Sequence, residues 1–140
     1  MLVDANVLVS SVDATSRQHA AASSWMDSHL TGQQRIGLPW NSLGAFLRIA
    51  THPRVFAEPL TVEEAWECVD AWMQSPVAWI PAAGDRTLSI LGDLVRRYGV
   101  TSNLVPDAQL AAQCVEHGVP VVTFDSDFER FTEITVVRPQ

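Results

Sequence analysis

The sequence lacks lysine altogether, contains few cysteines and has no long apolar run. Its two cysteines, Cys68 and Cys114, stand singly inside helix-like segments without a neighbouring histidine. This spacing argues against a cysteine-based metal module and indicates buried, reduced thiols. No apolar run approaches the roughly 20 residues that span a bilayer, and no basic leader with a small-residue cleavage site is visible. We therefore expect an untargeted, cytoplasmic protein without a membrane segment.

Charge is sparse and mostly of one sign. Only 18% of the residues are charged, and 16 acidic residues against nine arginines give a formal net charge of -7. Such a balance argues against a protein that coats nucleic acid through a broad basic surface. It leaves open an acidic pocket that bound cations neutralise. With 47% apolar residues the chain is not disordered, and 140 residues predict one domain over residues 1–140.

Strand-like and helical segments alternate along the chain. Strands are predicted over residues 1–5, 35–39, 77–81, 119–124 and 134–138, and helices over residues 17–30, 41–50, 62–73, 85–98 and 108–117. The segment Thr61–Glu64 is a capping-box signature, and Gly99 and Gly118 are natural helix ends. Alternation with helices of this length implies crossover connections. We expect a three-layer α/β/α sandwich with a central, mostly parallel sheet.

Four aspartates fall at or beside the carboxyl ends of predicted strands. Asp4 lies in the apolar first segment, while Asp125 and Asp127 follow the fourth strand. Asp107 opens the helix that leads to that fourth strand. If the first and fourth strands are neighbours, these carboxylates converge where open parallel sheets bind ligands. Buried acids are costly without a cation or hydrogen bonds, and Mg²⁺ or Mn²⁺ prefers oxygen ligands. Such a site would activate a water and clamp a phosphodiester.

Each aspartate also has a purely structural interpretation. Asp107 could be only an N-cap, and Asp125 with Asp127 could form only a turn. Asp4 is harder to explain in this way, because a central strand seldom carries an unpaired acid. Taken together, the four positions favour a metal site.

The tryptophans favour packing over recognition. Trp25, Trp66 and Trp72 fall on apolar helical faces, and Trp79 lies in a predicted strand. Core packing or a dimer surface explains them better than a platform for stacking bases. Trp40, directly after a strand, is ambiguous.

Three motifs in order resemble one known family: Val3–Leu8, Asn103–Ala112 and Val122–Phe128. Together with residues 38–56 they are similar to PIN-domain ribonucleases and, more narrowly, to VapC-type toxins of bacterial type II toxin–antitoxin pairs. The resemblance implies a Mg²⁺-dependent endoribonuclease, with Mn²⁺ as a possible substitute, that cuts structured RNA such as tRNA or rRNA. It also implies a homodimer and inhibition by a cognate VapB-like antitoxin. Because an open groove of carboxylates attracts arginine, we expect the antitoxin to insert a basic residue there.

The resemblance also implies roles for individual residues. Catalytic positions of the family match Asp4, Asp107, Asp125 and Asp127. Of these, Asp4 and Asp107 match the principal metal ligands, Asp125 matches a further metal-binding acid, and Asp127 matches a more variable supporting carboxylate. Asn6 and Thr123 match polar neighbours that could orient the cluster through hydrogen bonds.

The chain departs from the family pattern at Ala45. Many members carry a glutamate at this place on the second predicted helix, and no acid lies between Asp27 and Glu58 to replace it. The loss should weaken metal affinity or shift the ligand set toward Asp127 and water molecules. It could also mean that one metal, not two, binds before RNA.

Three basic side chains beyond the same helix are left open. Arg48, His52 and Arg54 could contact phosphate at the rim of the cluster. A solvated or ion-paired arginine is an equal alternative. His52 could act as an acid or base, although a histidine before proline is more often structural.

Two other functions compete with a nuclease. A receiver-like or phosphatase-like domain also gathers aspartates around Mg²⁺, but such sites usually need a lysine. They also use an Asp-x-Asp motif where this chain has Asp4-Ala5-Asn6. A catalytically silent PIN fold that serves as a binding module is favoured by Ala45 and opposed by the four aspartates.

Overall fold

The structure is a computed structural model that describes residues 1–140, and its centre is a five-stranded sheet. The strands are β1 (Leu2–Val3), β2 (Ile36–Gly37), β3 (Ala78–Trp79), β4 (Val121–Val122) and β5 (Val136–Val137). Their order is β3-β2-β1-β4-β5, and every neighbouring pair is parallel. The predicted parallel sheet is confirmed, although each strand is shorter than expected.

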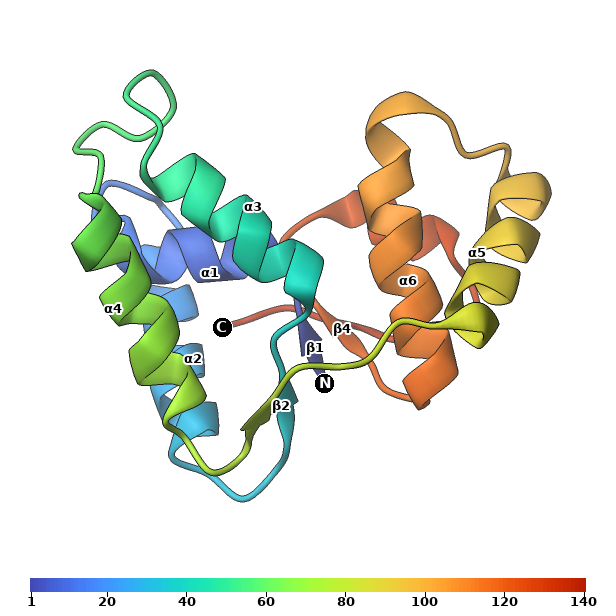
Figure 1. The fold of residues 1–140 in the computed structure, drawn as a ribbon, viewed down its shortest axis with the longest axis horizontal. Coiled ribbons are helices and arrows are strands. Elements are labelled where there is room, and N and C mark those ends of the chain that lie inside the picture. Colours follow the sequence, from blue (N-terminus) through green and yellow to red (C-terminus); the bar gives the residue numbers. More distant parts are fainter.

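Six helices enclose this sheet from two sides (Figure 1). They are α1 (Ala5–Val12), α2 (His19–Leu30), α3 (Trp40–Ala50), α4 (Val62–Met73), α5 (Asp85–Tyr98) and α6 (Val105–His117), with short 3₁₀ segments η1 (Ser102–Leu104) and η2 (Ser126–Arg130). In Figure 1, α1 to α4 lie on one side of the strands and α5 with α6 on the other. This arrangement confirms the three-layer sandwich. No helix combines the length and the apolar character needed to cross a membrane.

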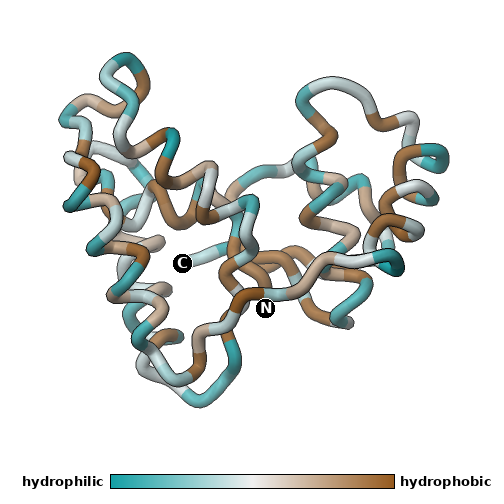
Figure 2. The backbone as a smooth tube through the Cα atoms, viewed as in Figure 1, coloured by the Kyte–Doolittle hydropathy of each residue, from teal (hydrophilic) through white to brown (hydrophobic).

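Two hydrophobic cores lie between these layers. Alternate side chains of a strand point to opposite faces of its sheet. Accordingly Val3 and Val122 pack with α1 to α4, whereas Leu2 and Val121 pack with α5 and α6. All four side chains are fully buried. Figure 2 shows the hydrophobic stretches gathered at these central strands.

The helix α1 corrects the prediction for the start of the chain. The first nine residues have a buried-strand pattern, and a strand was expected over residues 1–5. The structure ends β1 at Val3 and begins a helix at Ala5. Val7 and Leu8 lie in the same core, whereas consecutive strand residues would point to opposite faces. A short apolar run with many β-branched residues does not by itself distinguish a buried strand from a buried helix.

Helix ends agree with the predicted signals. The Thr61 hydroxyl oxygen accepts the Glu64 N–H at 3.1 Å, and the Glu64 carboxylate accepts the Thr61 N–H at 2.8 Å. This reciprocal pair is the expected capping box. The helices α5 and α6 are directly followed by Gly99 and Gly118, whose φ angles of 60° and 63° favour glycine.

Candidate metal centre

The sheet order places the strand ends that carry Asp4 and Asp125 side by side. β1 pairs directly with β4, in the register Leu2 to Val121 and Val3 to Val122. The Asp4 N–H donates to the Val122 carbonyl at 2.9 Å, so Asp4 continues this ladder by one residue. The expectation that the first and fourth strands are neighbours is confirmed. Asp4 thus lies at the junction of β1 with α1, not in the middle of a strand.

Asp107 approaches the same place from α6, but not as the predicted N-cap. The helix begins at Val105, so Asp107 is the third residue of its first turn and makes no capping bond. Pro106 fits there because the first N–H groups of a helix need no partner within it. No hydrogen bond lowers the pKa of Asp107. Its carboxylate is therefore free to bind a ligand.

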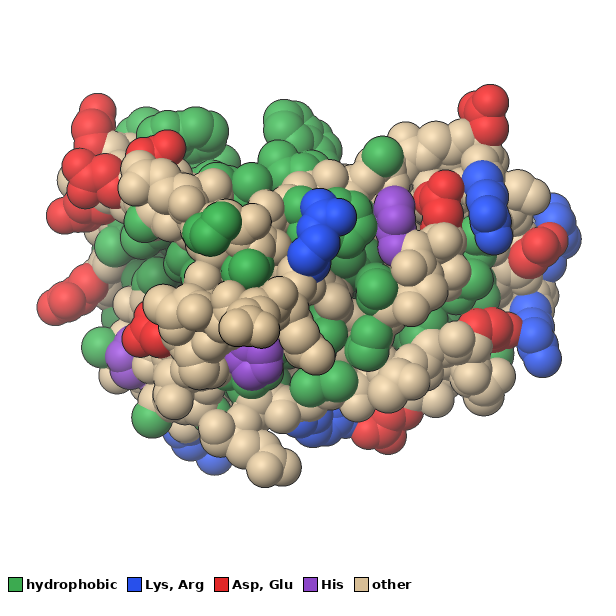
Figure 3. All heavy atoms as spheres, turned by 90° about the horizontal axis from the view of Figure 1, so that it is seen from below, with side chains coloured by type: hydrophobic (Ala, Val, Ile, Leu, Met, Phe, Trp, Pro, Cys, Tyr) green, Lys and Arg blue, Asp and Glu red, His purple; other side chains and the backbone are tan.

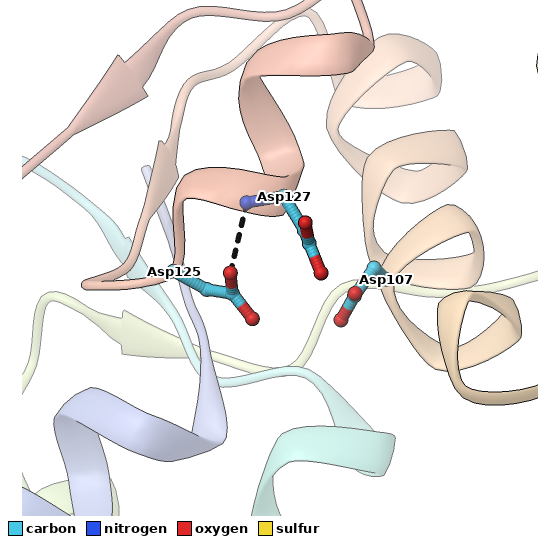
Figure 4. Close-up of side chains that lie close together, drawn as sticks. All are labelled: Asp107, Asp125 and Asp127. Atoms are coloured by element: carbon cyan, nitrogen blue, oxygen red, sulfur yellow. Dashed lines mark hydrogen bonds between the residues drawn. The ribbon is translucent and has the colours of Figure 1, made fainter.

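Three carboxylates come together in this region. Single oxygens of Asp107, Asp125 and Asp127 all lie within 4.8 Å of one another. Figure 4 shows Asp107 reaching from α6 toward the two aspartates that follow β4. Asp125 Oδ1 also accepts the Asp127 N–H at 2.8 Å, the dashed line in that figure. The turn interpretation and the cluster interpretation of these two aspartates therefore describe the same geometry.

Asp4 lies outside this group of three but is tied to it by hydrogen bonds. The Thr123 hydroxyl donates to Asp4 Oδ2 at 2.7 Å and accepts the Asp125 N–H at 3.0 Å. Asn6 Nδ2 donates to the same hydroxyl at 2.9 Å. Thr123 is completely buried. One buried hydroxyl thus orients Asp4 and the backbone of Asp125, as the family resemblance implied for Asn6 and Thr123.

Burial and the neighbouring carboxylates act together on the pKa of Asp107. Burial, followed by repulsion from Asp125, Asp4 and Asp127, raises the pKa of Asp107 from 3.8 to about 6, against the attraction of Arg130. A bound cation would remove this repulsion.

The pKa of Asp4 is also raised, and for a similar reason. Burial is the largest cause that raises the pKa of Asp4, and the Asp125 charge adds to it, while the Thr123 hydrogen bond opposes both. The charged carboxylates repel one another and no lysine is available to neutralise them. A donor set made only of carboxylate oxygens fits a hard cation such as Mg²⁺ or Mn²⁺. Which of these oxygens bind a metal stays a prediction.

Arg130 is a member of the site that the sequence did not reveal. Its Nε donates to the Asp127 carbonyl at 3.1 Å, and its Nη2 lies 3.2 Å from Asp127 Oδ1. The spacing of three residues within a short helical segment is the only signal that could have indicated this pair. His52 has a local role, since its Nδ1 accepts the Arg54 N–H at 3.0 Å. Roles of Arg48, His52 and Arg54 at the cluster stay predictions.

Comparisons with known proteins agree with this geometry. The family model of the PIN domain matches residues 1–134. Ribonuclease VapC37 of Mycobacterium tuberculosis is 40% identical over 138 residues, which are 99% of this chain and 96% of the relative. Ribonuclease VapC33 of the same species is 36% identical over 139 residues, covering 99% of this chain and 97% of the relative.

Solved structures show the same fold. The crystal structure of M. tuberculosis VapC20, described as a sarcin–ricin loop cleaving toxin, aligns with a TM-score of 0.71 at 19% identity, covering 99% of this chain and 98% of that one. VapBC2 of Rickettsia felis, bound to a promoter DNA fragment, aligns with a TM-score of 0.71 at 12% identity and the same coverage. From the full-length match and these identities, the chain belongs to the PIN-domain family and, within it, to the VapC ribonuclease toxins.

Proposed function

We propose that this chain is a Mg²⁺-dependent endoribonuclease, with Mn²⁺ as a second usable cation, that cuts a structured RNA of the tRNA or rRNA class. The observation that carries the proposal is the convergence of Asp107, Asp125 and Asp127 within 4.8 Å, beside the hydrogen-bonded Asp4. Such a set of acids is unfavourable on its own, as the raised pKa of Asp107 indicates. A divalent cation would compensate these charges and could at the same time bind the anionic phosphodiester.

The side chains of the site are proposed to have two roles in binding that cation. Asp4, Asp107 and Asp125 are proposed as its ligands, and Asp127 as a supporting carboxylate held by Arg130. A bound cation would polarise the phosphate and lower the pKa of the attacking water. Thr123 keeps Asp4 in one orientation, which favours a defined binding geometry over a mobile one.

The absence of the family glutamate at position 45 fits this division. Asp127 already lies with Asp107 and Asp125, so it can take over part of the missing ligand's role, with water molecules completing the shell. A catalytically silent binding module is the alternative that Ala45 favours. The retained cluster supports the enzyme instead.

The proposed partner is a cognate VapB-like antitoxin that inhibits a homodimeric toxin in the cytoplasm. Support comes from related folds that were solved as toxin–antitoxin complexes. The net charge of -7 and a cluster of carboxylates in which Arg130 pairs only with Asp127 favour an antitoxin that offers a basic residue to the site.

The test is a comparison of RNA ends after induced expression of the wild type, Asp4→Asn and the matched control Asp27→Asn, whose side chain is exposed on α2. We expect defined new ends in the wild type and the control, and none in Asp4→Asn. Purified wild type should make the same cuts with Mg²⁺ and lose them with a chelator. Cleavage without a metal, or full activity in Asp4→Asn, contradicts the mechanism.

A further inference from the structure

A cavity of about 530 Å³ opens between α3, α5 and α6. Its walls come from the start of α3 (Trp40, Asn41), the start of α5 (Asp85, Leu88) and one face of α6 (Gln109, Gln113). The helices α3 and α5 follow the carboxyl ends of β2 and β3, so the cavity lies at the sheet edge that also carries Asp4. Its volume falls within the usual range of small-molecule sites.

The lining of this cavity suits a planar, uncharged group with polar edges. No lysine, arginine or histidine lines it, and Asp85 is acidic, so phosphate is a poor ligand. Asn41, Gln109 and Gln113 each offer an amide that both donates and accepts hydrogen bonds. Trp40 is 72% exposed at the rim, where an indole can stack on a flat ring. A nucleobase has these properties.

Gln113 supplies an independent indication of a ligand. Its side chain is only 6% exposed, and its single hydrogen bond, from Nε2 to the Pro81 carbonyl, is 3.5 Å long. A buried amide normally finds several partners, because leaving it unpaired costs stability. The other buried polar wall residue, Thr87, is satisfied: its hydroxyl donates to Glu116 and accepts the Gly84 N–H. Gln113 is thus the buried wall residue with hydrogen-bonding capacity to spare, since Nε2 makes one long bond and Oε1 makes none within the protein.

We propose that this cavity binds one adenine base of the RNA substrate. Trp40 stacks on the base, Gln113 and Gln109 pair with its edge, and Asp85 accepts a hydrogen bond from the exocyclic amino group. Asparagine and glutamine amides are matched to adenine, whereas guanine is usually read by arginine or lysine, which this cavity lacks. The assignment rests on the RNA cleavage proposed above. It adds a residue-level reason for the choice of cleavage site.

A second hollow, between α3 and α4, has a different character. Apolar side chains including Trp66, Val69 and Met73 form most of its lining, and it contains no amide. Figure 3 shows hydrophobic side chains projecting along the upper edge of the molecule in that view. Trp40 borders both hollows. A protein that covers Trp40 is therefore the competing outcome of the test.

The test uses full-length Asp4→Asn protein, so that no RNA cleavage is involved. The indole N–H signals of ¹⁵N-labelled protein are followed by NMR during titration with adenosine, inosine or uridine, and the Trp40 signal is assigned by its loss in Trp40→Leu. We expect adenosine to shift the Trp40 signal in a saturable way. Inosine has a carbonyl in place of the amino group, and its affinity should be lower than that of adenosine by at least about tenfold.

Two further variants separate binding from folding. Gln113→Leu should abolish the adenosine response without lowering the melting temperature, because an apolar side chain replaces an under-paired amide. Trp66→Leu is the matched control: it removes another exposed tryptophan outside this cavity and should leave adenosine affinity unchanged.

Three results overturn the proposal. They are equal responses to adenosine and uridine, an unchanged response in Gln113→Leu, and a change of sedimentation mass in Trp40→Leu with nucleoside binding intact. The last result assigns Trp40 to a protein interface. If adenosine binds but RNA is not cleaved, the proposed nuclease activity is wrong. If RNA is cleaved but adenosine does not bind, the proposed base site is wrong.

Discussion

The acidic cluster and the cavity between α3, α5 and α6 differ in charge and in how their side chains are held. In the acidic cluster, hydrogen bonds from Thr123 and from the Asp127 backbone orient Asp4 and Asp125, and the charges repel one another. In the cavity, helices position neutral amides, and Gln113 makes one long hydrogen bond. A cation held by such a cluster would bind any phosphodiester, whereas a cavity of amides can discriminate between bases. RNA cleavage and base selectivity can therefore depend on separate sets of residues.

The largest difference in metal affinity should come from removing one carboxylate from the acidic cluster and, separately, one from the cavity. Asp107→Asn is expected to lower Mn²⁺ affinity by more than about a hundredfold, since changes to groups that only support ligands already cost about 10- to 100-fold. Asp85→Asn, in the cavity, should change it by no more than about twofold. Isothermal titration calorimetry with Mn²⁺ measures both. Equal losses of Mn²⁺ affinity in the two variants would show that Asp85 and the acidic cluster belong to one cation site.

A smaller effect is expected from the hydroxyl that holds the cluster. Thr123→Val keeps the shape of the side chain but leaves Asp4 Oδ2 and the Asp125 N–H without their partner. Metal affinity should fall by about 10- to 100-fold, while adenosine affinity in the cavity should not change. Thr123→Ser, which retains the hydroxyl, is the matched control and should restore metal binding. An unchanged affinity in Thr123→Val argues against an orienting role.

The smallest expected effect is on the stability of the metal-free protein. Because the pKa of Asp107 is about 6 when folded and 3.8 ordinarily, the folded state binds more protons between these values. The free energy of unfolding should therefore fall as pH rises from about 4 to about 6, and Asp4 acts in the same direction. Partial solvent screening of Asp107 keeps its share below about 1 kcal/mol.

Urea unfolding at several pH values measures this change. Asp107→Asn should flatten the dependence, and saturating Mn²⁺ should reverse it, because metal binds the ionised carboxylates of the folded state. Asp85→Asn serves as the control and should keep the wild-type slope. A metal-free stability that rises over this pH window contradicts the repulsion described for the cluster.

The acidic cluster was open to prediction because strand order places distant aspartates together. Parallel strands end at a common edge, so Asp4 and Asp125 could be brought together once β1 and β4 were taken as neighbours. The start of α6 was misjudged, since Pro106 is compatible with a first helical turn as well as with a loop before it. The spacing of Trp66 left core packing and a dimer surface open, because helical periodicity does not reveal how wide the buried face is. An exposed fraction of 58% excludes the core for Trp66.

The cavity left no comparable signal in the sequence. Its amides come from α3 and α6, and Asp85 comes from α5, so no spacing along the chain unites them. An isolated glutamine such as Gln113 is usually exposed, and only the packed structure shows that it is buried with one long hydrogen bond. Arg130 was missed for a related reason, because an arginine three residues from an aspartate is common on exposed helices.

The hydrogen bond between Thr123 and Asp4 also has a consequence during protein synthesis. The two residues are 119 positions apart, so Asp4 leaves the ribosome long before its partner exists. A nascent chain that ends between Asp107 and β4 contains Asp4 and Asp107 but neither Asp125 nor Asp127. Translation that stops before β4 therefore yields fragments without an assembled centre.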